Sequence, residues 1–161
     1  MIGIRAAGPD DAVAIWQVLR AVIEPGDTFP FEPDASRQEV LATWFSPGTH
    51  LYVAEDDGQV VGSYFIRPNQ PGLGAHVANG SYAVHPSFRR RGVGRAMAEH
   101  SFAEARALGF RALQFNLVVS TNESAIALWR SLGFETVGRL PGAFNQPGRG
   151  YVDALVMFKT L

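Results

Sequence analysis

Cysteine is absent from the 161 residues of the chain. This absence excludes a disulfide framework, a zinc–cysteine site and a cysteine nucleophile. The histidine, aspartate and glutamate residues show no metal-ligand spacing, so we expect no metal site. No apolar run approaches the roughly 18 to 20 residues that a membrane span needs. The start, MIGIRAAGPDD, has no basic segment followed by an apolar run, so we expect no signal peptide and a cytoplasmic location.

An excess of charge of either sign is also missing. Lysine plus arginine number 14 and aspartate plus glutamate number 15, which leaves a formal net charge of −1. No global field attracts nucleic acid or an anionic membrane, so we expect neither as a partner. Apolar residues make up 47% of the chain, enough for a core, and charged residues make up 18%, too few for a disordered chain. The length fits a single domain over residues 1–161.

Hydrophobic periodicity predicts the order β-α-α-β-β-β-α-β-α-β-β. Hairpins at both ends favour antiparallel pairs, and the strand–helix–strand run over 79–119 favours one right-handed parallel crossover. We therefore expect a mixed α/β (α+β) fold, with a largely antiparallel sheet and helices on both faces. The predicted strands are 2–6, 50–55, 59–67, 79–84, 111–119, 135–140 and 151–159. The predicted helices include 13–23, 92–108, 123–132 and one that is capped at Ser36, has its apolar face at 40–45 and is closed by Pro47-Gly48. Loops cover 141–150 and at least part of 68–78.

The most informative stretch is residues 84–95, with the sequence VHPSFRRRGVGR. A predicted strand ends here, the chain turns, and a helix begins at Gly92 and Gly94. A helix start exposes unpaired N–H groups and a partial positive charge, and glycine lets the backbone approach a bulky anion. The pattern indicates a phosphate or pyrophosphate site; a glycine-rich helix cap with solvated arginines is the plain alternative. The arginines that add positive charge are Arg89, Arg90, Arg91 and Arg95.

Two common anion-binding motifs do not fit this stretch. A P-loop needs Gly-x-x-x-x-Gly-Lys-Ser/Thr, which is absent. A dinucleotide fingerprint needs a third glycine where Met97 stands, and an acid at the end of the next strand, where residues 117–119 are Leu-Val-Val. Residues 89–94 instead match Gln/Arg-x-x-Gly-x-Gly/Ala, and so the loop resembles that of the GNAT N-acetyltransferases.

A second motif extends the resemblance to the GNAT superfamily. Residues 122–134 read Asn-x-x-Ala-x-x-Leu-Trp-x-x-x-Gly-Phe, which is similar to the family's Asn-x-x-Ala-x-x-Leu-Tyr-x-x-x-Gly-Phe stretch. The order of elements also matches the family fold along nearly the whole chain. The resemblance implies acetyl-coenzyme A (acetyl-CoA) as donor and a primary or secondary amine as acceptor. It also implies a V-shaped gap between the strands at 79–84 and 111–119, in which the pantetheine arm lies.

The same resemblance assigns the cofactor contacts. Backbone N–H groups of residues 91–95 hold the pyrophosphate, and free backbone groups of 82–84 pair with the pantetheine arm. Asn122 contacts the cofactor at a helix start, where asparagine is also an ordinary N-cap; the two roles are compatible. Trp129 stands where many relatives have a tyrosine, and its indole is no acid, so we expect it to pack against the pantetheine or the core. The cofactor-binding residues are thus Ala83, Val84, Arg89, Arg90, Arg91, Gly92, Val93, Gly94, Arg95, Asn122 and Trp129.

The sequence offers no obvious general base. Some relatives carry a glutamate at the position of Leu117, and leucine cannot replace it, which argues against a close copy of the ribosomal-protein acetylating branch. An acceptor with a low amine pKa needs no strong base. A backbone N–H near Val84 is the expected donor to the developing oxyanion. The candidate bases are Tyr82, His76 and a water held by Asn79 or Ser81.

Two asparagines are the candidate substrate-binding residues. Asn116 interrupts a strand expected to be central, where a buried amide needs a partner, either in a neighbouring element or in the gap. Asn79 opens the facing strand. Together with Asn122 and short segments near 115–118, 128–129, 137–141 and 150–154, they are similar to a narrower branch, the fungal proline-analogue (azetidine-2-carboxylate) N-acetyltransferases. This resemblance implies a small amino or imino acid acceptor; the predicted catalytic residues are Asn79, Asn116 and Tyr82.

The segment 26–33 is expected to line the acceptor site. Phe29 and Phe31 would give a compact, partly apolar pocket, with Glu32 or Asp27 to meet a cation; packing of this segment as a lid on the core is the alternative. The loop 141–150 is expected to close this pocket or that of a partner in a homodimer. We therefore expect an acetyl-CoA-dependent N-acetyltransferase acting on a small-molecule amine. The alternatives are a protein N-terminal or polyamine acetyltransferase and a non-catalytic acyl-CoA-binding domain.

Overall fold

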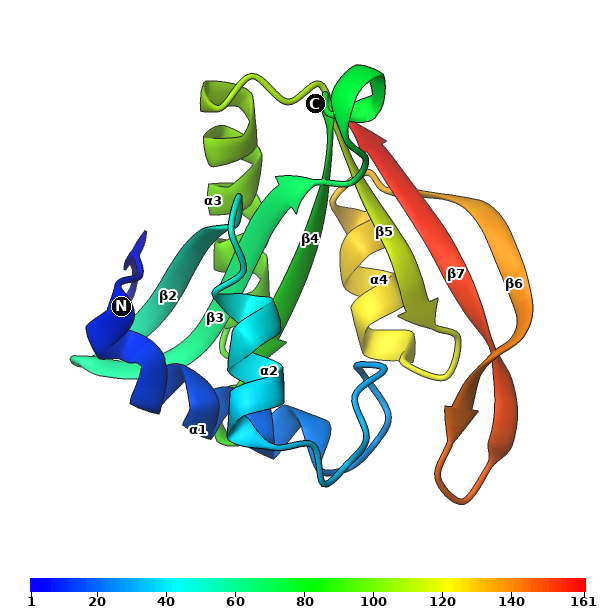
Figure 1. Ribbon diagram of the computed structural model, residues 1–161, viewed down its shortest axis with the longest axis horizontal. Helices are drawn as coiled ribbons and strands as arrows, with labels where there is room; N and C mark the ends of the chain where they lie inside the picture. Colours follow the sequence, from blue (N-terminus) through cyan, green and yellow to red (C-terminus); the bar gives the residue numbers. More distant parts are fainter.

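The computed structural model describes residues 1–161 and contains one seven-stranded sheet in the order β1-β2-β3-β4-β5-β7-β6 (Figure 1). No helix combines the length and the apolar character required to cross a membrane. The strands are β1 (Ile2–Ala6), β2 (His50–Asp56), β3 (Gln59–Pro68), β4 (Val77–Val84), β5 (Ala112–Val119), β6 (Glu135–Gln146) and β7 (Gly150–Thr160). The helices are α1 (Ala12–Ile23), α2 (Arg37–Trp44), α3 (Val93–Ala107) and α4 (Glu123–Ser131), with 3-10 turns at Pro9–Asp11, Gly72–Gly74 and Pro86–Phe88.

All strand pairs are antiparallel except β4 and β5, which confirms the predicted fold class. The parallel pairing covers only Val77–Asn79 against Ala112–Gln114. Beyond these residues β4 stays with β3 and β5 stays with β7, and the two strands diverge (Figure 1). The register of β5 against β7 also shifts between Phe115 and Val118. The sheet is therefore split along its middle.

Helices cover both faces of the sheet, as the alternating pattern predicts. On β3, Tyr64 and Ile66 join a core cluster with residues of α3 and α4, whereas Phe65 between them joins a cluster with residues of α1 and α2. Successive strand side chains point to opposite faces, so one strand contributes to both clusters. The gap between β4 and β5 therefore opens onto two faces of the sheet, each covered by its own pair of helices and its own core cluster.

Two predicted boundaries were wrong. β4 begins at Val77, two residues before the predicted strand. The expected loop 141–150 is mostly strand, because β6 continues to Gln146 and only 147–149 form the turn. An irregularity between Leu140 and Phe144 takes up the intervening residues, and Phe144 then pairs with Val152 and is buried. β6 tolerates Pro141 because it is an edge strand.

Candidate functional site

The divergence of β4 and β5 opens a cleft of about 250 Å³. None of the side chains that line it is charged, and no group of three or more His, Cys, Asp or Glu side chains in the structure is arranged to hold a metal ion. The cleft therefore works by shape, hydrogen bonds and aromatic contact. Its lining residues are Thr28, Phe29, Pro30, Asn79, Gly80, Ser81, Tyr82, Phe115, Asn116, Leu117, Val118, Val119, Asn122, Ala125 and Trp129.

Aromatic rings form the wall of the cleft on the α3–α4 side. The ring centroids of Phe115 and Trp129 lie 4.6 Å apart, and those of Tyr82 and Trp129 lie 4.9 Å apart. Phe134 stacks on Phe115 from the core at 4.5 Å. Trp129 is buried against the core and also lines the cleft, while its contact with a pantetheine arm stays a prediction.

Tyr82 presents its ring to the cleft and its hydroxyl to the core. Its hydroxyl lies 2.7 Å from Ser101 Oγ, and Ser101 in turn donates to the backbone oxygen of Ala98. Because the serine proton is used there, Tyr82 is the donor in this pair. Burial raises the pKa of the Tyr82 phenol well above its usual value. This geometry does not support Tyr82 as a base, and the other candidate side chain, His76, is exposed and does not line the cleft.

Amide side chains lie on the opposite, α1–α2 side. Asn79 Nδ2 donates to the backbone oxygen of Gln114 at 3.0 Å, across the last parallel pair. The expectation that Asn116 is buried was wrong, because the irregular register of β5 leaves it exposed at the cleft. Its Nδ2 donates to Asn69 Oδ1 at 2.7 Å, and its Oδ1 accepts from Gln114 Nε2 at 3.0 Å. Asn69 and Gln114 were not predicted from the sequence. Gln114 could have been, because it lies two residues before Asn116 and so points to the same face of the strand.

The segment 26–33 covers one end of the cleft. Phe29 lines the cleft and packs edge-on against Trp44, with ring centroids 5.6 Å apart. Phe31 packs against the α1–α2 core cluster and does not line the cleft, so only Phe29 lies where both were expected. A Cβ atom at Gly26 would lie 2.7 Å from Pro147 Cγ, so this segment touches the β6–β7 turn. No residue of 141–150 lines the cleft and Phe144 is buried, so closure of the pocket by this segment stays a prediction.

The anion-binding loop precedes α3. Arg90 and Gly92 have left-handed backbone angles, with φ of 62° and 81°. The backbone N–H groups of residues 90–95 have no acceptor in the protein, and the first helical bond runs from Ala96 to Gly92. Consecutive free N–H groups at a helix N-terminus favour an anion, and strain at a non-glycine residue such as Arg90 is typical of functional sites. The loop therefore fits the pyrophosphate of a coenzyme.

The arginine side chains surround this loop at the surface. Arg89, Arg90 and Arg91 are exposed, and the Arg91 guanidinium lies 5.0 Å from the ring centroid of Phe88. Arg95 donates to Ser131 Oγ of α4 at 2.9 Å. A Cβ atom at Gly94 would lie 3.8 Å from Val84 Cγ2, so the loop adjoins the end of β4. The loop thus lies next to the end of the strand whose residues 79–82 line the cleft.

Helix α4 forms one wall of the cleft. Asn122 caps the helix by accepting the N–H of Ala125 at 3.4 Å, and both residues line the cleft together with Trp129. Asn122 is thus the N-cap that the sequence indicated, and it lies where a cofactor contact was expected. The spacing of three and four residues along α4 places these side chains on one helix face.

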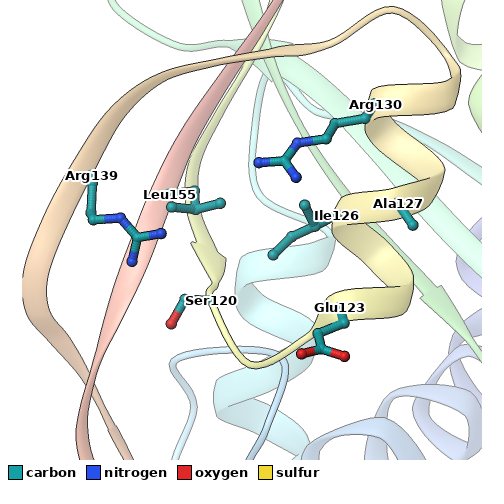
Figure 2. A pocket seen from close by; sticks show the side chains of 7 residues that line it. All are labelled: Ser120, Glu123, Ile126, Ala127, Arg130, Arg139 and Leu155. Carbon is teal, nitrogen blue, oxygen red and sulfur yellow. The ribbon is translucent and has the colours of Figure 1, made fainter.

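The opposite face of α4 borders a second cavity of about 260 Å³ (Figure 2). Arg130 from α4 and Arg139 from β6 extend into it from opposite walls, and Ile126 and Leu155 lie between them. Arg139 is paired with Asp153 at 2.8 Å. No residue predicted for the site lies here, so α4 separates this cavity from the cleft.

Replacing Gly92 by alanine tests the anion-binding loop. The left-handed conformation costs an L-residue roughly 1–2 kcal/mol, so we expect Gly92→Ala to weaken coenzyme A binding about tenfold in a calorimetric titration. Gly109→Ala is the matched control, because Gly109 has φ of 87° and lies just beyond the other end of α3. Equal losses of affinity in the two variants would contradict a binding role for the loop.

Known proteins show the same fold. Residues 16–134 match the acetyltransferase (GNAT) family model. The N-acetyltransferase aca1 of Schizosaccharomyces pombe is 34% identical over 151 residues, which cover 83% of this chain and 72% of that protein. A GCN5-related N-acetyltransferase from Kribbella flavida has a TM-score of 0.93 at 41% identity, covering 99% of this chain and 98% of that one.

A third relative was solved with its cosubstrate. The phosphinothricin acetyltransferase of Sinorhizobium meliloti, in complex with acetyl-CoA, has a TM-score of 0.87 at 26% identity, covering 99% of this chain and 88% of that one. The likeness to the fungal aca1 is consistent with the narrower branch indicated by the sequence. Since the family model spans most of the chain and these structures share its fold, the protein belongs to the GNAT family of acetyl-CoA-dependent N-acetyltransferases.

Proposed function

We propose that the protein acetylates the amine of a small amino or imino acid. The observation that carries this proposal is the uncharged cleft of about 250 Å³, with the amides of Asn79 and Asn116 on its acceptor side. An amide offers a donor and an acceptor at once, which suits a molecule that has a carboxylate beside its amine. A polyamine would call for acidic side chains, and none lines the cleft.

In the proposed reaction, backbone groups make most of the contacts with the cosubstrate. Acetyl-CoA supplies the activated acetyl thioester. Free N–H groups of residues 90–95 hold its pyrophosphate, and the unpaired edge of β4 from Gly80 to Val84 binds its pantetheine arm. A backbone N–H near Val84 stabilises the negative charge that develops on the thioester oxygen. Trp129 cannot protonate the leaving thiolate, so that proton comes from water.

The neutral amine is selected without a side-chain base. Tyr82 is the one titratable side chain that lines the cleft, and its phenol is a donor with a raised pKa. Water therefore takes the proton, and the acceptor reacts in the fraction that is already unprotonated. Asn79 and Asn116 act by positioning that amine in line with the thioester.

The pH dependence tests this account. We expect kcat/KM to rise with pH and to level off at the pKa of the acceptor's own amine, because protonation below that pKa removes the reactive form. With two acceptors of different amine pKa, the inflection should move with the acceptor. An inflection at one fixed pH for both acceptors would instead reveal a base on the protein.

A thiol-release assay with acetyl-CoA tests the acceptor class. The panel contains azetidine-2-carboxylate, free amino acids, methionine sulfoximine, polyamines, aminoglycosides and N-terminal peptides, and we expect turnover with the small amino or imino acids. Asn116→Ala should lower their kcat/KM at least about tenfold, as expected for loss of a hydrogen bond to a charged group, with coenzyme A affinity unchanged. Gln59→Ala, at an exposed position of β3, is the control. Wild-type rates in Asn116→Ala would contradict the proposed role.

We also propose that residues 1–161 act as one catalytic domain within a homodimer. β6 is an unpaired edge strand, and the apolar side chains of Val137, Leu140 and Tyr151 are exposed on β6 and β7. An exposed apolar edge favours pairing with a second chain. Sedimentation equilibrium should show a dimer for the wild type and a monomer for Val137→Lys; a monomeric wild type would contradict the dimer.

A further inference from the structure

Four residues with amide side chains are linked by hydrogen bonds at the place where β4 and β5 stop pairing. Asn79 reaches across the last parallel pair to the backbone oxygen of Gln114, and the Gln114 side chain donates to Asn116. Asn116 donates to Asn69, which lies just after β3. The contacts measure 3.0, 3.0 and 2.7 Å, and they join three separate segments of the chain.

The backbone contact fixes the orientation of Asn79. A carbonyl oxygen only accepts hydrogen bonds, so the Asn79 atom that faces Gln114 O is the amide nitrogen. Its Oδ1 has no partner in the protein and lies at a residue that lines the cleft. Asn79 therefore offers an acceptor for the N–H of an incoming amine.

Asn116 is held from both sides. Its Oδ1 accepts from Gln114 and one proton of its Nδ2 goes to Asn69. A side-chain amide has two N–H donors, so a single N–H of Asn116 remains unused at the cleft. Asn69 is itself anchored, because its backbone N–H donates to Val77 O at 2.8 Å and its side chain is half-buried.

We propose that Asn69 and Gln114 are positioning residues, which hold the Asn116 amide so that its remaining N–H meets the carboxylate of the acceptor. Neither residue lines the cleft, so both act through Asn116. With Asn79 Oδ1 directed at the amine, the site recognises an amine and a carboxylate that are carried by the same carbon atom. This inference rests on the proposed function and extends it to the two groups that select the substrate.

The test compares azetidine-2-carboxylate with azetidine, which lacks the carboxylate. The readout is the ratio of kcat/KM for the two acceptors. We expect Asn69→Leu and Gln114→Leu each to lower this ratio about three- to tenfold through a higher KM for azetidine-2-carboxylate, with kcat and coenzyme A affinity retained. Gln70→Leu, at the exposed neighbouring position, should keep the wild-type ratio.

Conservative variants test the direction of the hydrogen bonds. Asn69→Asp keeps an acceptor for Asn116 Nδ2, so its KM for azetidine-2-carboxylate should stay closer to wild type than that of Asn69→Leu. Gln114→Glu replaces the donor to Asn116 Oδ1 by an acceptor, so its ratio should fall at least as far as that of Gln114→Leu. Rescue by Asn69→Asp separates positioning from a merely structural role.

The outcomes distinguish the two proposals. Unchanged ratios in both leucine variants, with turnover of azetidine-2-carboxylate by the wild type, overturn the roles of Asn69 and Gln114 alone. Equal loss of activity toward both acceptors also overturns them, because a general structural defect does not discriminate a carboxylate. Failure of the wild type on every amino and imino acid, with coenzyme A still bound, overturns the proposed function and with it this inference.

Discussion

The short parallel pairing of β4 with β5 is the constraint on which the site depends. Only Val77–Asn79 and Ala112–Gln114 hold the two strands together. Beyond them β5 follows β7, and the rings of Tyr82, Phe115 and Trp129 fill the α3–α4 side of the opening. A continuous ladder would use the backbone groups of β4 within the sheet, whereas the split leaves them for a cosubstrate.

The split also joins two sides of the sheet that the alternation of strand side chains makes chemically different. Asn79 and Ser81 belong to the side with α1, α2 and Phe29, while Gly80 and Tyr82 belong to the side with α3 and α4. In the proposed reaction the acceptor and the acetyl thioester meet in the gap between β4 and β5.

The left-handed conformation of Arg90 costs roughly 1–2 kcal/mol, and a bound anion offsets such a cost.

Local patterns in the sequence were sufficient for much of this architecture. Gly92 and Gly94 predicted the start of α3, and Asn122 predicted the start of α4. The order of the elements predicted one parallel strand pair, which is β4 with β5. Features that depend on long-range packing were not predictable. The exposure of Asn116 follows from a register shift against β7, and its contact with Asn69 spans 47 residues. The inward hydroxyl of Tyr82 depends on Ser101, in a helix whose rotation the sequence does not specify.

Hydrogen exchange of the backbone amides, measured with and without coenzyme A, tests most directly the claim that the split binds the cosubstrate. We expect protection to rise in residues 80–84 and 90–95, whose cleft-facing or helix-start amides lack protein partners, and to stay constant in β1 and β2. Protection confined to the cavity between α4 and β6, or no change in 80–84, would contradict it.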